Sequence, residues 1–331
     1  MTPPINDSEL AYANGVGAAA DIVDMTKESK EEEVEQPTTK QGTTMPFRSA
    51  SVGSSGAAAG ALTPAERRTI MNKASEVFPG LMTGTVLSQK LDTVLSSDKA
   101  NYKPESTLLA TSLCSDEVNR EFEDSLKAIY GYNFSMGGLA GFAFGGVTSF
   151  GAMANHIPTN GSCLIVYGPH VGIDKDGIVG KINRVGRPGP SGACCGSATA
   201  AYGYCQMVLN GECKETKVNP DDFVDAQQVM VGSALLPHGQ RLKDAATPEV
   251  ELPFALFDCQ DDLMQRIVAK ACGEVATDNT PNGCGGKIAL LGGIQINTPN
   301  GMPEYFLPQK FVLLNNKGEI VADLLEDLNE A

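Results

Sequence analysis

A near-continuous apolar segment, residues 163–170, places the strongest constraint on the fold of this chain. An apolar run of this length is typical of a strand that is buried on both faces of a sheet. Residues 107–113 form a second apolar strand, and residues 287–297, 306–314 and 319–324 are expected to be late strands. Helical patterns lie between these strands. The sequence therefore predicts an α/β fold with a mostly parallel central sheet flanked by helices, and an antiparallel extension.

The first helix of the folded region has a clear start signal. Thr63 is an N-cap, Pro64 occupies the first helical position, and Glu66 completes a capping box. Ser115 or Asp116 is expected to cap a helix that ends at Gly131. Further helices are expected over 196–209, from Asn219-Pro220 toward Leu236, and over 257–271.

Residues 1–62 differ in composition from the rest of the chain. They combine a charge run with a Ser/Gly/Ala tract and contain few large apolar residues. Such a segment buries too little apolar surface to offset the entropy lost on ordering. We therefore expect residues 1–62 to be a disordered tail and residues 63–331 to be one folded domain.

The charge balance excludes several classes of partner. The chain has 25 Lys and Arg against 40 Asp and Glu, a net charge of −15, which argues against nucleic acid and anionic membranes. No apolar run approaches the roughly 20 residues of a membrane span, and no secretory signal is evident. A soluble intracellular protein with reduced thiols is expected. Most of its nine cysteines should pack as small apolar residues, namely Cys163, Cys205, Cys213, Cys259 and Cys272.

Three soft ligands stand at predicted strand ends or helix starts: Cys114, His170 and one of Cys194 and Cys195. The carboxyl ends of strands form the usual site crevice in open α/β sheets. Two thiolates and an imidazole, with a fourth position left for water, make the ligand set of a catalytic zinc site. Cys195 is favoured over Cys194 because Gly196 and a helix follow it directly. Cys114 is also expected at a helix N-terminus, which would lower its pKa.

Asp116 and Arg120 are the candidate catalytic pair. Their spacing of four residues lets the side chains meet on one helix face, either as a surface ion pair or as a gate beside the water position of the metal. Arg184 and Arg187 are the next candidates for the partner of Asp116. Weaker candidate site residues are His156, His238 and Cys284.

The segment 137–150 is rich in glycine and aromatic residues but lacks phosphate-loop spacing. Its side chains Phe142, Phe144 and Phe150 are candidates for the walls of an apolar substrate pocket. Ordinary helix–loop packing explains the same composition equally well.

The motifs at 114–116, 145–151, 167–172, 193–196 and 289–297 resemble those of the limiting-CO2-inducible protein B family of algae and diatoms. The resemblance spans about residues 63–326. It implies a β-carbonic-anhydrase-like fold, zinc held by Cys/His/Cys, a homodimer or a hetero-oligomer with a paralogue, and a role in carbon-concentrating metabolism. It also implies a chloroplast location, with the cytoplasm as the alternative.

Two departures from ordinary β-carbonic anhydrases are visible. Those enzymes carry an arginine two residues after the aspartate of the dyad, where this chain has Val118. Their zinc histidine also lies close to the second cysteine, whereas His170 lies far upstream of Cys195.

The sequence predicts a zinc-dependent carbonic anhydrase that interconverts carbon dioxide and bicarbonate. One alternative is a catalytically silent zinc-binding subunit of a carbon-concentrating complex. The other is a thiol-redox protein that uses Cys194 and Cys195.

Overall fold

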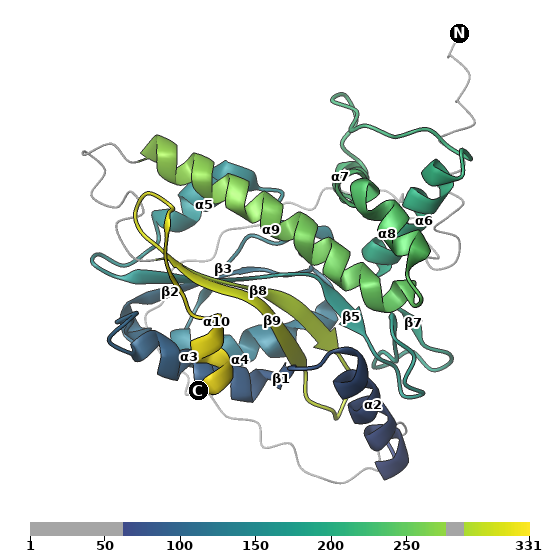
Figure 1. Cartoon of the computed structure of the whole chain (residues 1–331), viewed down its shortest axis with the longest axis horizontal. Helices are drawn as coiled ribbons and strands as arrows, with labels where there is room; N and C mark the ends of the chain where they lie inside the picture. Colours follow the sequence, from purple (N-terminus) through teal and green to yellow (C-terminus); the bar gives the residue numbers. More distant parts are fainter. Residues whose placement is uncertain (1–61, 276–287) are drawn as a thin grey trace, which may run out of the picture.

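The structure, a computed structural model, describes residues 62–275 and 288–331 and has an eight-stranded sheet between layers of helices (Figure 1). The strands of this sheet are β1 (Met82–Thr83), β2 (Thr107–Ser112), β3 (Asn133–Ser135), β4 (Ser162–Tyr167), β5 (His170–Gly172), β8 (Ile288–Asn297), β9 (Tyr305–Leu314) and β10 (Ile320–Asp323). Two short strands, β6 (Lys181–Ile182) and β7 (Gly192–Ala193), pair with each other outside it.

The sheet has a parallel core and an antiparallel edge. Its order is β1-β9-β8-β4-β2-β3, with β10 on β9 and β5 on the end of β8. Strands β3, β2, β4, β8 and β5 run parallel, whereas β9 runs antiparallel to β8, β1 and β10. The predicted mostly parallel sheet with an antiparallel extension is therefore confirmed.

Alternation along the central strands divides the core between two faces. Within β4, Cys163 and Ile165 pack into one apolar cluster, and Leu164 and Val166 into the other. The first cluster lies under α2 (Pro64–Val77), α5 (Gly146–Ala154) and α9 (Pro248–Val275), and the second under α3 (Gly84–Ser96), α4 (Arg120–Tyr130) and α10 (Leu325–Glu330). Burial on both faces explains why 163–167 reads as a continuous apolar run.

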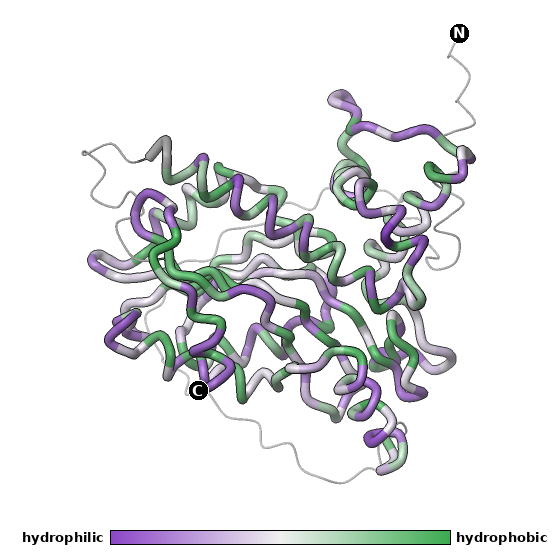
Figure 2. The backbone as a smooth tube through the Cα atoms, viewed as in Figure 1, coloured by the Kyte–Doolittle hydropathy of each residue, from purple (hydrophilic) through white to green (hydrophobic). Residues whose placement is uncertain are grey.

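A further group of helices packs at one end of α9: α6 (Gly196–Leu209), α7 (Ala226–Leu235) and α8 (Gly239–Asp244). Their apolar side chains form a third cluster, which also contains Cys114 and Cys195. Figure 2 shows hydrophilic residues in the outer turns and loops, and hydrophilic residues alternating with apolar ones along α9.

The predicted helix starts agree with the structure in part. Thr63 and Glu66 form the expected capping box, and α6 has the predicted bounds. Three starts differ: α4 begins only at Arg120, α7 only at Ala226, and α9 already at Pro248. Within the described residues, no helix has the length and apolar character needed to cross a membrane. The predicted disordered tail lies almost entirely outside the described residues, which begin at Leu62.

Candidate metal centre

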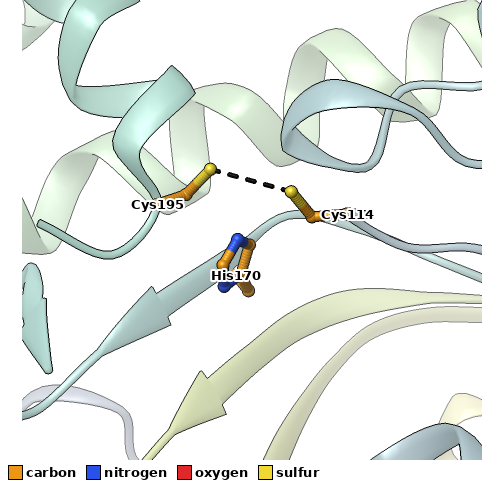
Figure 3. Close-up of side chains that lie close together, drawn as sticks. All are labelled: Cys114, His170 and Cys195. Carbon is orange, nitrogen blue, oxygen red and sulfur yellow. Dashed lines mark hydrogen bonds between the residues drawn. The ribbon is translucent and has the colours of Figure 1, made fainter. Parts of the chain in front are cut away.

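The candidate ligands lie where the carboxyl ends of the parallel strands face the start of α6 (Figure 3). Cys114 follows β2, His170 opens β5 directly after β4, and Cys195 is the N-cap residue of α6. The chain reaches His170 through Gly168, whose φ is 152°. A Cβ on Gly168 would lie 1.7 Å from the carbonyl oxygen of Gly293, so only glycine lets this turn pass close to β8.

The three side chains form a compact, buried cluster. The sulfur atoms of Cys114 and Cys195 are 3.9 Å apart, and with a ring nitrogen of His170 they all lie within 4.8 Å of one another. Each residue is at most 4% exposed. In Figure 3 the imidazole lies beside the gap between the two sulfurs, with one nitrogen on the side of that gap.

The imidazole of His170 has one satisfied nitrogen and one orphaned nitrogen. Nδ1 lies 2.7 Å from Oδ1 of Asn297, whereas Nε2 is buried and has no hydrogen-bond partner. Buried polar atoms in native proteins are almost always satisfied. A metal ion held by Nε2 and two sulfurs would satisfy this atom, and the soft donor set fits zinc.

Cys194 occupies a different place from its neighbour. Its sulfur lies 3.6 Å from Nδ1 of His170 and 3.7 Å from Oδ1 of Asn297. Cys194, His170 and Asp116 form a second group of possible metal-binding atoms within 4.8 Å of one another. The two vicinal sulfurs therefore face different partners, and the geometry groups Cys195, not Cys194, with Cys114.

The expected electrostatics of Cys114 are wrong. Helix α4 begins only at Arg120, so Cys114 is not at its N-terminus. The hydrogen bond with the Cys195 thiol, and then burial, raise the pKa of Cys114 to about 12. Burial alone lowers the pKa of His170, but the neighbouring thiols of Cys194 and Cys114 outweigh it and raise that pKa. A divalent cation would stabilise the thiolates that this site otherwise disfavours.

Asp116 is held by Arg184. The guanidinium donates to both carboxylate oxygens, at 2.7 and 2.8 Å, and also to Glu117 at 2.5 Å. The side chains of Asp116 and Arg184 are 13% and 18% exposed. Burial acts to raise the pKa of Asp116, but the hydrogen bonds from Arg184 lead the opposing effects, and the net pKa lies well below its usual range.

The expected pairing of Asp116 with Arg120 is wrong. Arg120 instead donates to Glu123 and to the carbonyl oxygen of Cys114, each at 2.5 Å. The spacing of four residues fails because Asp116 caps a separate 3-10 turn, Glu117–Asn119, that precedes α4. Arg120 therefore holds the backbone of the candidate ligand Cys114 and does not contact the carboxylate of Asp116.

An open cavity of about 920 Å³ leads to the cluster, lined by Cys114, Ser115, Asp116, Arg184, Arg187 and Cys195 among others. A second cavity, of about 750 Å³, touches His170, Cys194 and Cys195 and is lined by aliphatic side chains, among them Val77, Val179 and Leu256, and by charged ones, among them Lys73, Glu76 and Glu249. Both cavities therefore reach Cys195.

None of the three phenylalanines expected to form the substrate pocket lines either of these two cavities. Phe142 stacks on Phe144 with ring centroids 5.0 Å apart, and Phe142 packs in the third apolar cluster. Phe150 lies on α5 in the core under α9. The glycine-rich segment is therefore packing, the alternative that its composition left open.

The weaker candidates lie away from the cluster or outside the described residues. His156 is exposed and packs against the ring of Phe134, and His238 lies in a 3-10 turn before α8. Cys284 lies outside the described residues. Asn297, at the end of β8, is a site residue that the sequence analysis did not single out, although it closes a motif that carries the family resemblance.

Comparison with known proteins identifies the family. The profile of the limiting CO2-inducible proteins B/C β-carbonic anhydrases matches residues 82–315. The chain therefore belongs to this family. It matches no curated protein.

Solved structures agree with this membership. PtLCIB4, a homolog of the limiting CO2-inducible protein LCIB, is 40% identical with a TM-score of 0.69, and the match covers 77% of this chain and 100% of that chain. LCIB itself is 19% identical with a TM-score of 0.56, over 75% of this chain and 96% of that chain, which shows the shared fold.

Proposed function

We propose that this protein is a zinc-dependent carbonic anhydrase that interconverts carbon dioxide and bicarbonate. Membership of a carbonic-anhydrase-like family supports this reaction class. The observation that carries it is the buried group of Cys114, His170 and Cys195, in which Nε2 of His170 lacks a partner. These three residues would hold the ion, and zinc bound there would supply Lewis-acid activation of water.

Asp116 would act as a hydrogen-bond acceptor beside the ion. It lines the open cavity together with Cys114 and Cys195, and Arg184 keeps its carboxylate ionised and oriented. An ionised carboxylate accepts a hydrogen bond but cannot donate one. Asp116 would therefore orient the O–H of the reacting water so that an oxygen lone pair is free to meet carbon dioxide.

A catalytically silent zinc-binding subunit is the second candidate. A carboxylate oxygen of Asp116 lies within 4.8 Å of the donor atoms of His170 and Cys194. If Asp116 left Arg184 and bound the ion, its carboxylate would replace the water that the reaction needs. The site is then closed to water.

Family membership also supports a place in carbon-concentrating metabolism. We propose that the protein works as a homodimer or as a hetero-oligomer with a paralogue, in the chloroplast or alternatively the cytoplasm. Light scattering on the purified protein tests the oligomeric state, since the mass of a single chain with zinc bound would contradict a dimer or hetero-oligomer.

Carbon dioxide hydration by the full-length protein tests the proposal. Stopped-flow pH-indicator measurements should give a rate above the uncatalysed one that a zinc chelator abolishes and added zinc restores. A protein that carries zinc but gives only the uncatalysed rate would establish the silent subunit instead. A metal-free protein with the uncatalysed rate would remove both candidates.

A further inference from the structure

A network of buried, hydrogen-bonded polar side chains lies next to the imidazole of His170, and the proposed reaction gives these side chains no role. Asn119 and Asn297 are fully buried, and Glu304 is 6% exposed. Oδ1 of Asn297 lies 2.7 Å from Nδ1 of His170. Nδ2 of Asn297 lies 2.5 Å from Glu304 Oε2, 3.2 Å from Asn119 Oδ1 and 3.1 Å from the carbonyl oxygen of Val118.

These contacts determine which way the amide of Asn297 faces. Its three neighbours on one side are all oxygen atoms that accept hydrogen bonds, so the NH2 group must face them. Its Oδ1 therefore faces His170, and an amide oxygen can only accept. The proton of the neutral imidazole must then lie on Nδ1, which leaves the lone pair on Nε2.

The same network reaches the first sulfur ligand. Nδ2 of Asn119 donates to the carbonyl oxygen of Cys114 at 3.2 Å, and Oδ1 of Asn119 accepts from Asn297. Two buried amides thus connect the backbone of Cys114 to the ring of His170. Strands β5 and β8 place Asn297 beside the segment that carries His170, because Asn297 is paired in register with Gly172.

We propose that Asn297 is a positioning residue that holds His170 in the Nδ1–H tautomer, with Nε2 free to bind the metal between Cys114 and Cys195. Glu304 and Asn119 act through Asn297 by fixing the orientation of its amide. The inference rests on the proposed function only in taking zinc as the metal. Partners of ligand histidines set both the tautomer and the orientation of the ring.

Nitrogen-15 NMR of the zinc-loaded full-length protein tests the tautomer directly. The chain has three histidines. Replacing the other two, by His156→Gln and His238→Gln, assigns the remaining histidine signals to His170. We expect a slowly exchanging proton on Nδ1 of His170 and metal coordination at Nε2. A proton on Nε2 with coordination at Nδ1 would overturn the proposal, and this result needs no substitution at Asn297.

Two substitutions separate positioning from structural support. Asn297→Asp and Asn297→Leu both remove the three donor contacts of Nδ2, but only Asp keeps an acceptor for Nδ1–H. Chelator competition should show zinc affinity about 10- to 100-fold weaker for the Leu variant, the scale for such partners, and within a few-fold of wild type for Asp. Equal affinity of the two variants would overturn the proposal.

Gln295→Met is the matched control. Gln295 is fully buried on the same strand and donates to the same oxygen of Glu304 at 3.3 Å. It should leave zinc affinity and the His170 signals unchanged, and a loss equal to that of Asn297→Leu would assign the effect to Glu304 or to the core. Because hydration is not the readout, a zinc-binding protein without hydration activity would reject the proposed function and leave this inference standing.

Discussion

Two pairs of buried cysteines lie in the same apolar cluster and have different surroundings. Cys205 and Cys259 lie in the helical layer, where their thiols face the carbonyl oxygens of Gly232 and Ala234 at 3.8 and 3.1 Å. Cys114 and Cys195 lie at the end of the sheet, where their sulfurs face each other across 3.9 Å, with His170 beside them. Burial is common to both pairs. Only the second pair has a neighbouring nitrogen ligand.

Acidity does not distinguish the two pairs. Burial raises the pKa of Cys205 and of Cys259 to about 12. The pKa of Cys114 is also raised to about 12, first by the hydrogen bond with Cys195 and then by burial. A raised thiol pKa therefore does not identify a site here. The identity of the neighbouring groups does, because a carbonyl oxygen accepts the S–H proton whereas thiols around an imidazole can share a cation.

The largest expected effect is loss of the metal. Cys114→Ser should remove essentially all bound zinc and reduce hydration to the uncatalysed rate, because one of the three protein ligands is gone. Cys205→Ser is the matched control and should retain full zinc content, although its buried hydroxyl lowers stability. Mass spectrometry of metal content decides. Equal zinc content in the two variants would contradict the assignment of Cys114, and not Cys205, as a metal ligand.

The next largest effect is expected from Asp116, the carboxylate beside Cys114 and Cys195. Asp116→Asn keeps the size of the side chain but removes its charge, so hydration should fall on the order of 10²-fold while zinc stays bound. Stopped-flow rates and metal content measured on one preparation test this. An unchanged rate would exclude Asp116 from the reaction.

The two arginines near Cys114 should differ in the property they control. Arg184→Ala frees the carboxylate of Asp116 and should reduce hydration about tenfold or more. Arg120→Ala leaves the buried carboxylate of Glu123 without its ion-pair partner, and should lower the free energy of unfolding by about 1–3 kcal/mol with a smaller effect on rate. The reverse pattern in rates and denaturant unfolding would restore Arg120 as the partner of Asp116.

The last effect concerns the stability contributed by Glu304, behind the sheet-end site, and leaves the reaction rate aside. Burial raises the pKa of Glu304 to about 7 and the charge of Glu121 adds to this, against hydrogen bonds from Asn297 and Gln295 that lower it. Between its ordinary pKa of 4.5 and about 7 the folded state binds more protons than the unfolded state. Stability should therefore fall by roughly 3 kcal/mol as pH rises through this window.

Glu304→Gln removes this titration. Denaturant unfolding of wild type and variant at a series of pH values should give curves that diverge below about pH 7, where the wild type gains stability that the variant does not. Parallel curves would mean that Glu304 titrates normally.

The sequence predicted the elements that carry the ligands because their signals are local. The apolar run 163–170 and the Gly196 start after Cys195 each mark an element end, although the structure divides that run into β4, which ends at Tyr167, and β5, which begins at His170. The carboxyl ends of parallel strands meet at one edge of a sheet, so the gathering of these residues followed from the fold class.

The partners of the site were predicted less well because they depend on long-range packing. Arg184 reaches Asp116 from a loop 68 residues further along the chain, and Asn297 reaches His170 across 127 residues. The Asp116–Arg120 prediction assumed one continuous helix, which the turn Glu117–Asn119 interrupts. The phenylalanines fitted a core and a pocket wall equally well, since both environments are apolar.

Titration of the metal-free, reduced full-length protein with zinc tests the central claim most directly. Bound zinc and the rate of carbon dioxide hydration are followed on the same sample. Both should rise together and level off at about one zinc ion per chain. If the thiols are confirmed as reduced and neither bound zinc nor the hydration rate rises to a plateau, the assignment of Cys114, His170 and Cys195 as a catalytic zinc site is contradicted.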